Sequence, residues 1–503
     1  MTGGTTLLAR VRGLVRAASE VYRASPAAGL LATTAARLDE PLRVAIAGRV
    51  KAGKSTLLNA LVGQELAATD AGECTRIATW YRNGTSYRLT VYPRSGAPFQ
   101  LPFARSGAAT QVELKGLEPQ DVDRLVVDWP STALQEMTLI DTPGLGSVNV
   151  ELSDYTAALL APEGQRASTA DAVLYLMRHL HGLDVRFLEA FHDEPGRRRP
   201  FNTIGILARA DEIGHGRPDS LDSAARIAAR YRGDSRVRQL CQTVIPVSGL
   251  LAASGATLRE TEYRALHLIA AAAPEAARQL LTSADRLAAA PTPIELLPVE
   301  RAGLLERFGV FGIRLATELV RTGKVSGAAE LSQALLHCSG LRELRELLMT
   351  RFAARAEVLK SRSALVALDS VVRQFPDPAA EQIIRALEEI RAGAHEFAEI
   401  ALLDALRTGG SGLPTRALDA AERLLGGAGV DDRSRLGLEP TATDSAVIEA
   451  VREALARWQR TAEAMVTPRD AREAARVLVR TCEGILFSQL AAQYHSSLST
   501  PRR

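Results

Sequence analysis

One eight-residue segment, Gly48 to Ser55, constrains the fold of this chain more than any other. It reads Gly-Arg-Val-Lys-Ala-Gly-Lys-Ser, the pattern GxxxxGK[ST], and stands between an apolar run at Leu42–Ala47 and a helical pattern at Thr56–Val62. A strand, a glycine-rich loop and a helix in this order form a P-loop, whose backbone N–H groups and helix N-terminus bind phosphate. The segment therefore predicts a nucleotide-binding α/β domain.

The P-loop pattern also assigns roles to its residues. We expect Lys54 to bind the β- and γ-phosphates and the Ser55 hydroxyl to ligate Mg²⁺. The further residues expected around the phosphates are Gly48, Val50, Lys51, Ala52, Gly53 and Thr56.

A second phosphate-directed pattern lies at residues 141–144, which read Asp-Thr-Pro-Gly after the apolar run Met137–Ile140. In this DxxG pattern, Asp141 is expected to contact Mg²⁺ through water and the Gly144 amide to sense the γ-phosphate. Thr75, in the polar loop between the two motifs, is expected to ligate Mg²⁺ when a γ-phosphate is present. A helix cap at Asp141 and an ordinary loop hydroxyl at Thr75 are the alternatives.

Base recognition is expected at the ends of two later apolar runs. A carboxylate at Asp211 can accept hydrogen bonds from the N1–H and the exocyclic amine of guanine, and the aliphatic stem of Arg209 can cover the base. Ala208 stands where Asn or Thr would add a supporting hydrogen bond, so guanine is favoured over adenine without strict selectivity. Ser248 and Gly249 are expected to form the last base-contacting loop.

Between residues 41 and 255, short apolar runs alternate with helix-length segments, which is the pattern of a mostly parallel sheet covered by helices. Asn83-Gly84, before Tyr87, is typical of a two-residue turn and predicts an antiparallel hairpin near one edge. The predicted strands are Leu42–Ala47, Ile77–Arg82, Tyr87–Tyr92, Met137–Ile140, Ala172–Met177, Thr203–Leu207 and Thr243–Val247.

Strand patterns disappear in residues 256–503, which we expect to form an elongated all-helical neck and trunk. The last helix, with Leu478 on its apolar face, is expected to return toward the head and meet the helices of residues 1–40. The stripe of the N-terminal segment, which includes Val11, favours core packing over contact with a membrane surface. The long helical patterns are Leu341–Phe375, Ala379–Arg407, Ser445–Val466 and Arg469–Gln493.

Composition excludes several classes of protein. The formal net charge is +3 over 503 residues, whereas a protein that coats nucleic acid needs a basic excess. No apolar run reaches the ~18 residues of a spanning helix, and arginines interrupt the N-terminal segment, so no signal peptide is predicted. Neither a disulfide framework nor a zinc site is predicted, and a reducing cytosol is favoured, because the cysteines lie far apart, at Cys74, Cys241, Cys338 and Cys482.

Two smaller features are assigned structural roles. His179 and His181 have no acidic or cysteine partner nearby, so packing or capping is favoured over metal binding. The basic run Arg197–Arg199 is expected to be a solvated loop.

The order of these motifs resembles that of bacterial dynamin-like GTPases. The resemblance rests on the P-loop with Lys51, on Thr75-Arg76, on residues 141–144 and on the segment Arg209–Asp211, followed by a long helical half. It covers nearly the whole chain and points most closely to the actinobacterial group that includes the mycobacterial isoniazid-inducible proteins. It implies GTP hydrolysis with Mg²⁺, pairing of the heads, and deformation or fusion of membranes through the tip of a helical stalk.

The catalytic expectations differ from those for Ras-like switches. Leu145 stands where those proteins place a water-orienting glutamine, so intrinsic hydrolysis should be slow unless other groups help. The backbone of Thr75 can position the water. Lys51 can lie against the β–γ bridging oxygen and offset developing charge, in place of an arginine finger or a potassium ion. A solvated lysine is the alternative.

Contact with an anionic membrane surface is expected at a turn of the helical half, where apolar residues are flanked by arginines. Two turns, 408–416 and 426–440, have this pattern, and flexible connectors in a bundle are the alternative. The candidate membrane residues are Leu413, Arg416, Val430, Arg433 and Leu436.

The leading interpretation is a GTPase that remodels or tethers membranes, on the inner face of the cell membrane, as a homodimer or with a sister dynamin-like chain. The second interpretation is a weakly hydrolysing scaffold or partner subunit, which Ala208 and Leu145 favour. A ribosome-assembly GTPase would require a basic RNA-binding domain after the head, and the helical half has no such excess.

Overall fold

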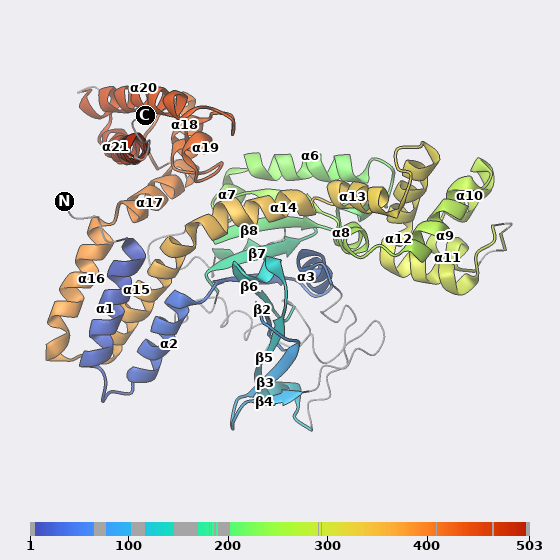
Figure 1. Cartoon of the computed structure of the whole chain (residues 1–503), viewed down its shortest axis with the longest axis horizontal. Coiled ribbons are helices and arrows are strands. Elements are labelled where there is room, and N and C mark those ends of the chain that lie inside the picture. The colour runs from blue at the N-terminus through green and yellow to red at the C-terminus, as the bar shows by residue number, and fades with distance from the viewer. Residues whose placement is uncertain are drawn as a thin grey trace.

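A single sheet organises the N-terminal half of the chain in this computed structural model (Figure 1). The structure describes residues 6–64, 77–101, 116–144, 170–180, 202–289, 294–408, 410–464 and 467–498, together with 182, 184, 185, 188, 189, 291 and 292. Within these residues the sheet has nine strands in the order β4-β3-β5-β2-β6-β1-β7-β8-β9. Their bounds are β1 Leu42–Gly48, β2 Thr79–Asn83, β3 Arg88–Pro93, β4 Phe99–Leu101, β5 Val122–Trp129, β6 Met137–Asp141, β7 Ala172–Met177, β8 Thr203–Ala208 and β9 Val244–Val247.

The centre of the sheet is parallel, as the sequence predicts. β1 pairs with β6 and β7, and β8 continues the parallel arrangement to β9. Every residue of β7 and β8 is buried, because helices cover both faces of a parallel sheet and its strands are then apolar throughout. The carboxyl ends of β1, β6 and β8 lead directly into the three motifs expected to bind nucleotide.

The antiparallel hairpin is confirmed, but its strands are not those predicted. β3 pairs with β4, whereas β2 and β3 do not pair, because β5 lies between them and is parallel to β2 and antiparallel to β3. The turn predicted at Asn83-Gly84 is therefore wrong: the Gly84 amide donates to the carbonyl of Trp129 at the end of β5 (3.3 Å). The Trp129 ring packs on Tyr87, 4.4 Å between centroids.

The core beneath the sheet extends beyond residue 255, the end predicted for the head. α14 (Leu341–Leu347) contributes Leu341 and Leu344 to the same cluster as β1 and α3 (Lys54–Val62). A π-helical turn (Leu348–Phe352) and a 3-10 turn (Ala353–Arg355) then continue it into α15 (Ala356–Gln374). One nearly continuous helical segment thus runs from the head core into the trunk.

The remaining helices form three groups around the head rather than one elongated bundle (Figure 1). The predicted combination of an α/β head with a helical trunk is confirmed. A lateral group contains α9 (Glu260–Ala271), α10 (Pro274–Leu280), α11 (Ala284–Ala289), α12 (Pro298–Arg321) and α13 (Ala328–Cys338). The head itself is covered by α6 (Ser220–Gly233), α7 (Ser235–Arg238) and α8 (Gly249–Ala256).

The two ends of the chain lie in different groups, which corrects the predicted contact between them. α1 (Leu7–Val21) and α2 (Ala28–Asp39) pack on α15 and α16 (Glu381–Gly393), and the apolar stripe of α1 is buried there. α21 (Arg469–Leu498) buries the face that includes Leu478 in a C-terminal group instead. The other helices of this group are α17 (His395–Thr408), α18 (Thr415–Leu424), α19 (Asp432–Leu436) and α20 (Asp444–Glu463).

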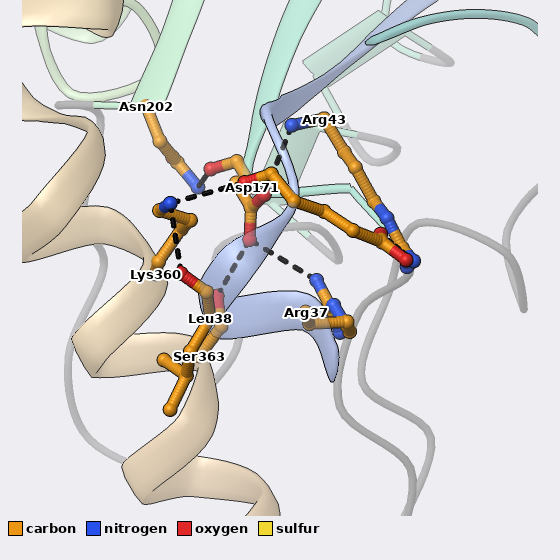
Figure 2. Close-up of polar contacts among 8 residues, drawn as sticks. Arg37, Leu38, Arg43, Asp171, Asn202, Lys360 and Ser363 are labelled. Carbon is orange, nitrogen blue, oxygen red and sulfur yellow. Dashed lines mark hydrogen bonds and ion pairs between the residues drawn. The ribbon is translucent and has the colours of Figure 1, made fainter. Parts of the chain in front are cut away.

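Asp171 joins the head to the trunk at the start of β7 (Figure 2). Its buried carboxylate accepts hydrogen bonds from Arg37 of α2 (3.0 Å), from the Arg43 amide at β1 (3.0 Å) and from the Ser363 hydroxyl of α15 (3.1 Å). Beside it, Lys360 of α15 donates to the carbonyls at the end of α2. We call Asp171, Arg37, Arg43 and Ser363 the head–trunk junction.

Two further sequence predictions concern membranes and cysteines. Over the described residues, no helix is both long and apolar enough to cross a membrane. The described cysteines, Cys241, Cys338 and Cys482, are free thiols, and Cys74 lies outside the described residues.

Candidate functional site

The P-loop connects β1 to α3 in a conformation that few residues tolerate. Gly48 has φ 150°, and a Cβ there would lie 2.5 Å from the carbonyl oxygen of Leu176, so only glycine fits against β7. Gly53 adopts φ 97° at the N-terminus of α3, and no side chain of the described residues caps that terminus. The first N–H groups of α3 are therefore available to an anion at this end of the helix.

Lys54 has no strong partner in the P-loop. Its Nζ lies 3.4 Å from the carbonyl oxygen of Gly48 and 3.5 Å from that of Arg49. Burial lowers the pKa of this amine, and the charge of Asp141 opposes the shift. A phosphate group would supply the negative charge that the two carbonyls provide only weakly.

Asp141 and Ser55 form the second part of the phosphate end. The Ser55 hydroxyl donates to Asp141 Oδ2 at 2.9 Å. Asp141 Oδ1 is buried and has no hydrogen-bond partner within the described chain. Burial raises the pKa of Asp141, while Lys54 and Ser55 favour its charged form. A hydroxyl and a carboxylate with a free oxygen suit Mg²⁺, which prefers oxygen ligands.

The DxxG segment lies directly against the P-loop. A Cβ added to Gly144 would lie 2.6 Å from Cγ2 of Val50 and 2.8 Å from its Cα, so a larger residue would collide with the loop. Thr142 binds the carbonyl oxygen of Ile46 through both its amide (3.3 Å) and its hydroxyl (2.9 Å). These contacts fix the end of β6 beside the phosphate end of the site.

The residues expected to bind the base lie at the ends of β8 and β9. Asp211 is 5% exposed and is hydrogen-bonded to Ser248. Burial raises the pKa of Asp211, and the Ser248 hydrogen bond opposes this shift. Gly249 approaches the P-loop helix, because a Cβ there would lie 3.3 Å from Cγ2 of Thr56.

Arg209 connects the base end to the phosphate end. It adopts a left-handed conformation (φ 54°). Its Nη2 donates to the Lys51 carbonyl oxygen at 2.9 Å, and its Nη1 pairs with Glu212 at 2.8 Å. Lys51 is also left-handed (φ 62°), and its side chain is exposed. The guanidinium is thus anchored in the P-loop, while the stem of Arg209 lines the cavity.

A cavity of about 1070 Å³ extends from the P-loop residues Arg49 and Val50 past Ala208 to Asp211. Cavities for small ligands are usually ~300–1,000 Å³, so this one has room for a nucleotide. Its far wall comes from the lateral helices, through Gly309 and Phe311 of α12. The sequence analysis did not predict this wall. A glycine inside a helical pattern can indicate a kink, and α12 is kinked at Gly309 (φ 61°, ψ 171°).

Arg314 of α12 fixes the loop that follows Asp211. Its Nη1 donates to the carbonyl oxygen of Gly216 at 3.0 Å, and its Nε donates to that of Leu281 at 2.8 Å. One guanidinium therefore joins the base end of the cavity to the end of α10.

The structure brings most of the predicted nucleotide residues around one cavity and its P-loop end. Thr75 and Leu145 lie outside the described residues, as do His181 and Arg197–Arg199. His179 lines the cavity, and the described part of the chain has no group of three metal-ligating side chains. The residues brought together are Gly48, Val50, Lys51, Ala52, Gly53, Lys54, Ser55, Thr56, Asp141, Gly144, Arg209, Asp211, Ser248 and Gly249.

The candidate membrane residues do not form an exposed apolar tip, which corrects that expectation. Leu413 is 8% exposed and belongs to the core of the C-terminal group, against which Leu436 also packs. Arg433 donates to the carbonyl oxygen of Ala442 and pairs with Asp444. Val430 is half-buried, and Arg416 is exposed. Leu413 and Leu436 are therefore part of the packing of the C-terminal group and are not free to insert into a membrane.

Comparison with known proteins gives consistent matches. Residues 44–210 match the family model described as the dynamin family. The chain is 38% identical over 488 residues to the isoniazid-induced protein IniC of Mycobacterium tuberculosis. The aligned region covers 95% of this chain and 98% of that protein. It is 33% identical over 166 residues to a bacterial dynamin-like protein of Nostoc punctiforme, covering 29% of this chain and 24% of that protein.

A solved structure is similar at a greater distance. It is described as an oligomerised bacterial dynamin pair that provides a mechanism for long-range sensing and tethering of membranes. The match covers 96% of this chain and 79% of that chain at 14% identity, with a TM-score of 0.32. This TM-score is too low to support an argument about the chain.

Proposed function

The chain belongs to the bacterial dynamin-like family, and on this premise we propose that it binds and hydrolyses GTP and couples the reaction to membrane remodelling or tethering. One observation carries the GTPase assignment. The P-loop residues Arg49, Val50 and Ala52 line one end of a large cavity, and the buried Asp211 lines the other. Lys54 and the Ser55–Asp141 pair belong to the same P-loop end, where Lys54 Nζ lies beside the carbonyl oxygen of Arg49. This arrangement suits a nucleotide with a phosphate chain and a hydrogen-bonding base.

The residues of the P-loop would bind and neutralise the phosphates. The free N–H groups at the start of α3 bind phosphate oxygens, and Lys54 places a positive charge beside them. Ser55 and Asp141 would hold Mg²⁺, which neutralises charge on the β- and γ-phosphates when it is bound. The Gly144 amide would detect whether the γ-phosphate is present, and Gly144 lies against Val50 of the P-loop.

We assign two further residues to the hydrolytic step. The Lys51 side chain is exposed at the mouth of the P-loop while its carbonyl is held by Arg209, so the loop can keep its shape as the amine turns to the β–γ bridging oxygen. Thr75 would ligate Mg²⁺ through its hydroxyl and position the attacking water through its backbone. Neither role requires the glutamine that Leu145 replaces.

Membrane coupling would depend on assembly. We propose that heads pair across bound nucleotide, either between two copies or with a sister dynamin-like chain, on the inner face of the cell membrane. The alternative is a weakly hydrolysing scaffold for another dynamin-like chain, favoured by Ala208 at the base site.

Replacing Asp211 with asparagine tests the base site. A hydrogen bond to a charged group contributes ~1.5–3 kcal/mol, so GTP affinity is expected to fall by about 10- to 150-fold. Xanthine carries an oxygen where guanine carries its amine, so the new amide N–H₂ should raise the affinity for XTP. Fluorescent-nucleotide titration measures both, with Asp222→Asn as an exposed control. Unchanged GTP affinity would contradict the assignment of Asp211.

Turnover per molecule separates the enzyme from the scaffold. If heads pair to complete the site, phosphate release per molecule should rise severalfold with protein concentration, and again when anionic vesicles concentrate the chain on a surface. A scaffold predicts a low rate that does not depend on either. Phosphate release is measured over a concentration series, with and without vesicles. A constant rate across the series would favour the scaffold.

A further inference from the structure

A second cavity, of about 650 Å³, is lined by residues of α18, α19 and α20. These helices belong to the C-terminal group (Figure 1). Four arginines line it, Arg423, Arg435, Arg457 and Arg460, together with apolar side chains that include Leu436 and Leu438. We call this cavity the arginine groove. It is separate from the nucleotide cavity, which is lined by no residue of α18–α20.

The positive charge of the groove is largely unbalanced. Arg435 pairs with Glu399 and donates to the carbonyl oxygen of Leu424 (2.6 Å), so it forms a fixed wall. Within the described chain, the other three guanidinium groups are ion-paired with no carboxylate. Among the described residues, Glu453 is the one acidic side chain in the lining. The groove therefore attracts anions.

The backbone leaves space for these side chains. α19 ends at Gly437 in a left-handed conformation (φ 74°). A Cβ at this position would lie 2.9 Å from Nε and 3.0 Å from Cζ of Arg423, so glycine leaves the room that the guanidinium occupies. Arg457 and Arg460 are three residues apart on α20 and therefore on the same side of the helix. Side chains at this spacing are neighbours on a helix surface, so one anion can contact both guanidinium groups.

We propose that the arginine groove binds the headgroup of an anionic phospholipid. Guanidinium groups bind phosphate oxygens with paired hydrogen bonds, and the side chains of Leu436 and Leu438 offer an apolar surface to the part of the lipid next to the phosphate. Arg423, Arg457 and Arg460 are exposed, so the groove can receive a headgroup that is still anchored in a bilayer. In the part of the chain that the structure describes, no aromatic side chain lines the groove to stack on a nucleobase.

This inference deepens the proposed function by placing the membrane contact in a groove that part of the second predicted turn, residues 426–440, forms with α18 and α20, rather than at an exposed apolar tip. Leu413 is buried, and Arg433 is engaged with Asp444, whereas Arg423, Arg457 and Arg460 are exposed and form no ion pair within the described chain. Arg435, Leu436 and Leu438 of the predicted turn line the groove, but here Leu436 is a wall of the groove rather than an inserted side chain.

Vesicle sedimentation of the full chain tests the groove. The double variant Arg457→Gln/Arg460→Gln should bind vesicles of phosphatidylglycerol and phosphatidylcholine about 30-fold more weakly, since each basic residue near an anionic surface contributes ~1 kcal/mol. The matched control, Arg452→Gln/Arg480→Gln, removes the same charge from exposed positions outside the groove. It should stay within about twofold of the unmodified chain, because a contribution of this size requires proximity to the lipid.

Each other outcome overturns a specific claim. Equal losses in the two double variants would mean general charge attraction and no defined site. If the unmodified chain does not bind anionic vesicles but hydrolyses GTP, both the proposed lipid binding by the groove and the membrane part of the proposed function are wrong. If inorganic phosphate alone raises the thermal midpoint of the unmodified chain but not that of Arg457→Gln/Arg460→Gln, the groove binds free phosphate rather than lipid. Basal GTP turnover should be the same in all these proteins.

Discussion

Lys54→Ala is expected to lower GTP turnover at least about a hundredfold, the usual effect of removing one preorganised charge from a phosphate or oxyanion site. The same change should not unfold the protein. Lys54 is half-buried beside two carbonyl oxygens at 3.4 and 3.5 Å, and burial lowers the pKa of its amine, so the free protein gains little from the charge. Phosphate release and thermal unfolding measure the two effects.

Nucleotide-dependent stabilisation distinguishes binding from hydrolysis in this experiment. A ligand that binds only the folded state raises its stability, so GTP with Mg²⁺ should raise the thermal midpoint of the unmodified chain but not that of Lys54→Ala. Lys51→Ala should keep the midpoint shift and lose turnover. Lys324→Ala, exposed and outside the site, is the control for loss of a lysine. Full stabilisation of Lys54→Ala would contradict the P-loop assignment, and normal turnover in Lys51→Ala would contradict the role of Lys51.

The placement of the candidate phosphate and base residues was predictable because these residues are close in sequence or follow strands. The P-loop is one continuous segment, and residues 141–144 and Asp211 follow buried strands whose apolar runs are plain in the sequence. In a parallel sheet, these carboxyl ends meet at one edge. The contacts between Ser55 and Asp141 and between Gly144 and Val50 follow from that rule.

Other parts of the fold were not predictable from local patterns. β5 reads Val-Asp-Arg-Leu-Val-Val-Asp-Trp, and neither strict alternation nor a continuous apolar run marks its start. Its pairing with β2 and β3 displaced the hairpin that Asn83-Gly84 indicated. α14 has helical periodicity like the trunk helices around it, so nothing local shows that Leu341 and Leu344 complete the core of the head.

The contacts of α12 and of the head–trunk junction depend on tertiary structure alone. Gly216 and Arg314 are 98 residues apart, and Asp171 and Ser363 are 192 residues apart. Charged side chains such as Arg314 and Asp171 usually face solvent. A single sequence therefore does not distinguish a charged residue that joins several elements by hydrogen bonds from one on the surface.

Asp171→Ala is expected to destabilise the folded chain by ~3–5 kcal/mol, because removing one partner of a buried ion pair leaves the other charge poorly compensated. The Asp171 side chain is 4% exposed and that of Arg37 is 16% exposed. The loss should appear as a lower midpoint of urea unfolding. Asp39→Ala is the matched control on α2, because it breaks a pair with Arg12 whose side chains are 70% and 41% exposed. Exposed pairs contribute ~0–1 kcal/mol.

A double-mutant cycle separates the ion pair from the other contacts of Asp171. The carboxylate also accepts hydrogen bonds from the Arg43 amide and from Ser363, so Asp171→Ala should cost more than Arg37→Ala. Their coupling energy should be ~0.5–3 kcal/mol, the range for residues in direct contact. Hydrogen exchange adds a spatial test: since these contacts join α2 and α15 to β1 and β7, Asp171→Ala should speed exchange in α2 while α3 stays protected. A cost no larger than that of Asp39→Ala would show that Asp171 does not hold the trunk on the head.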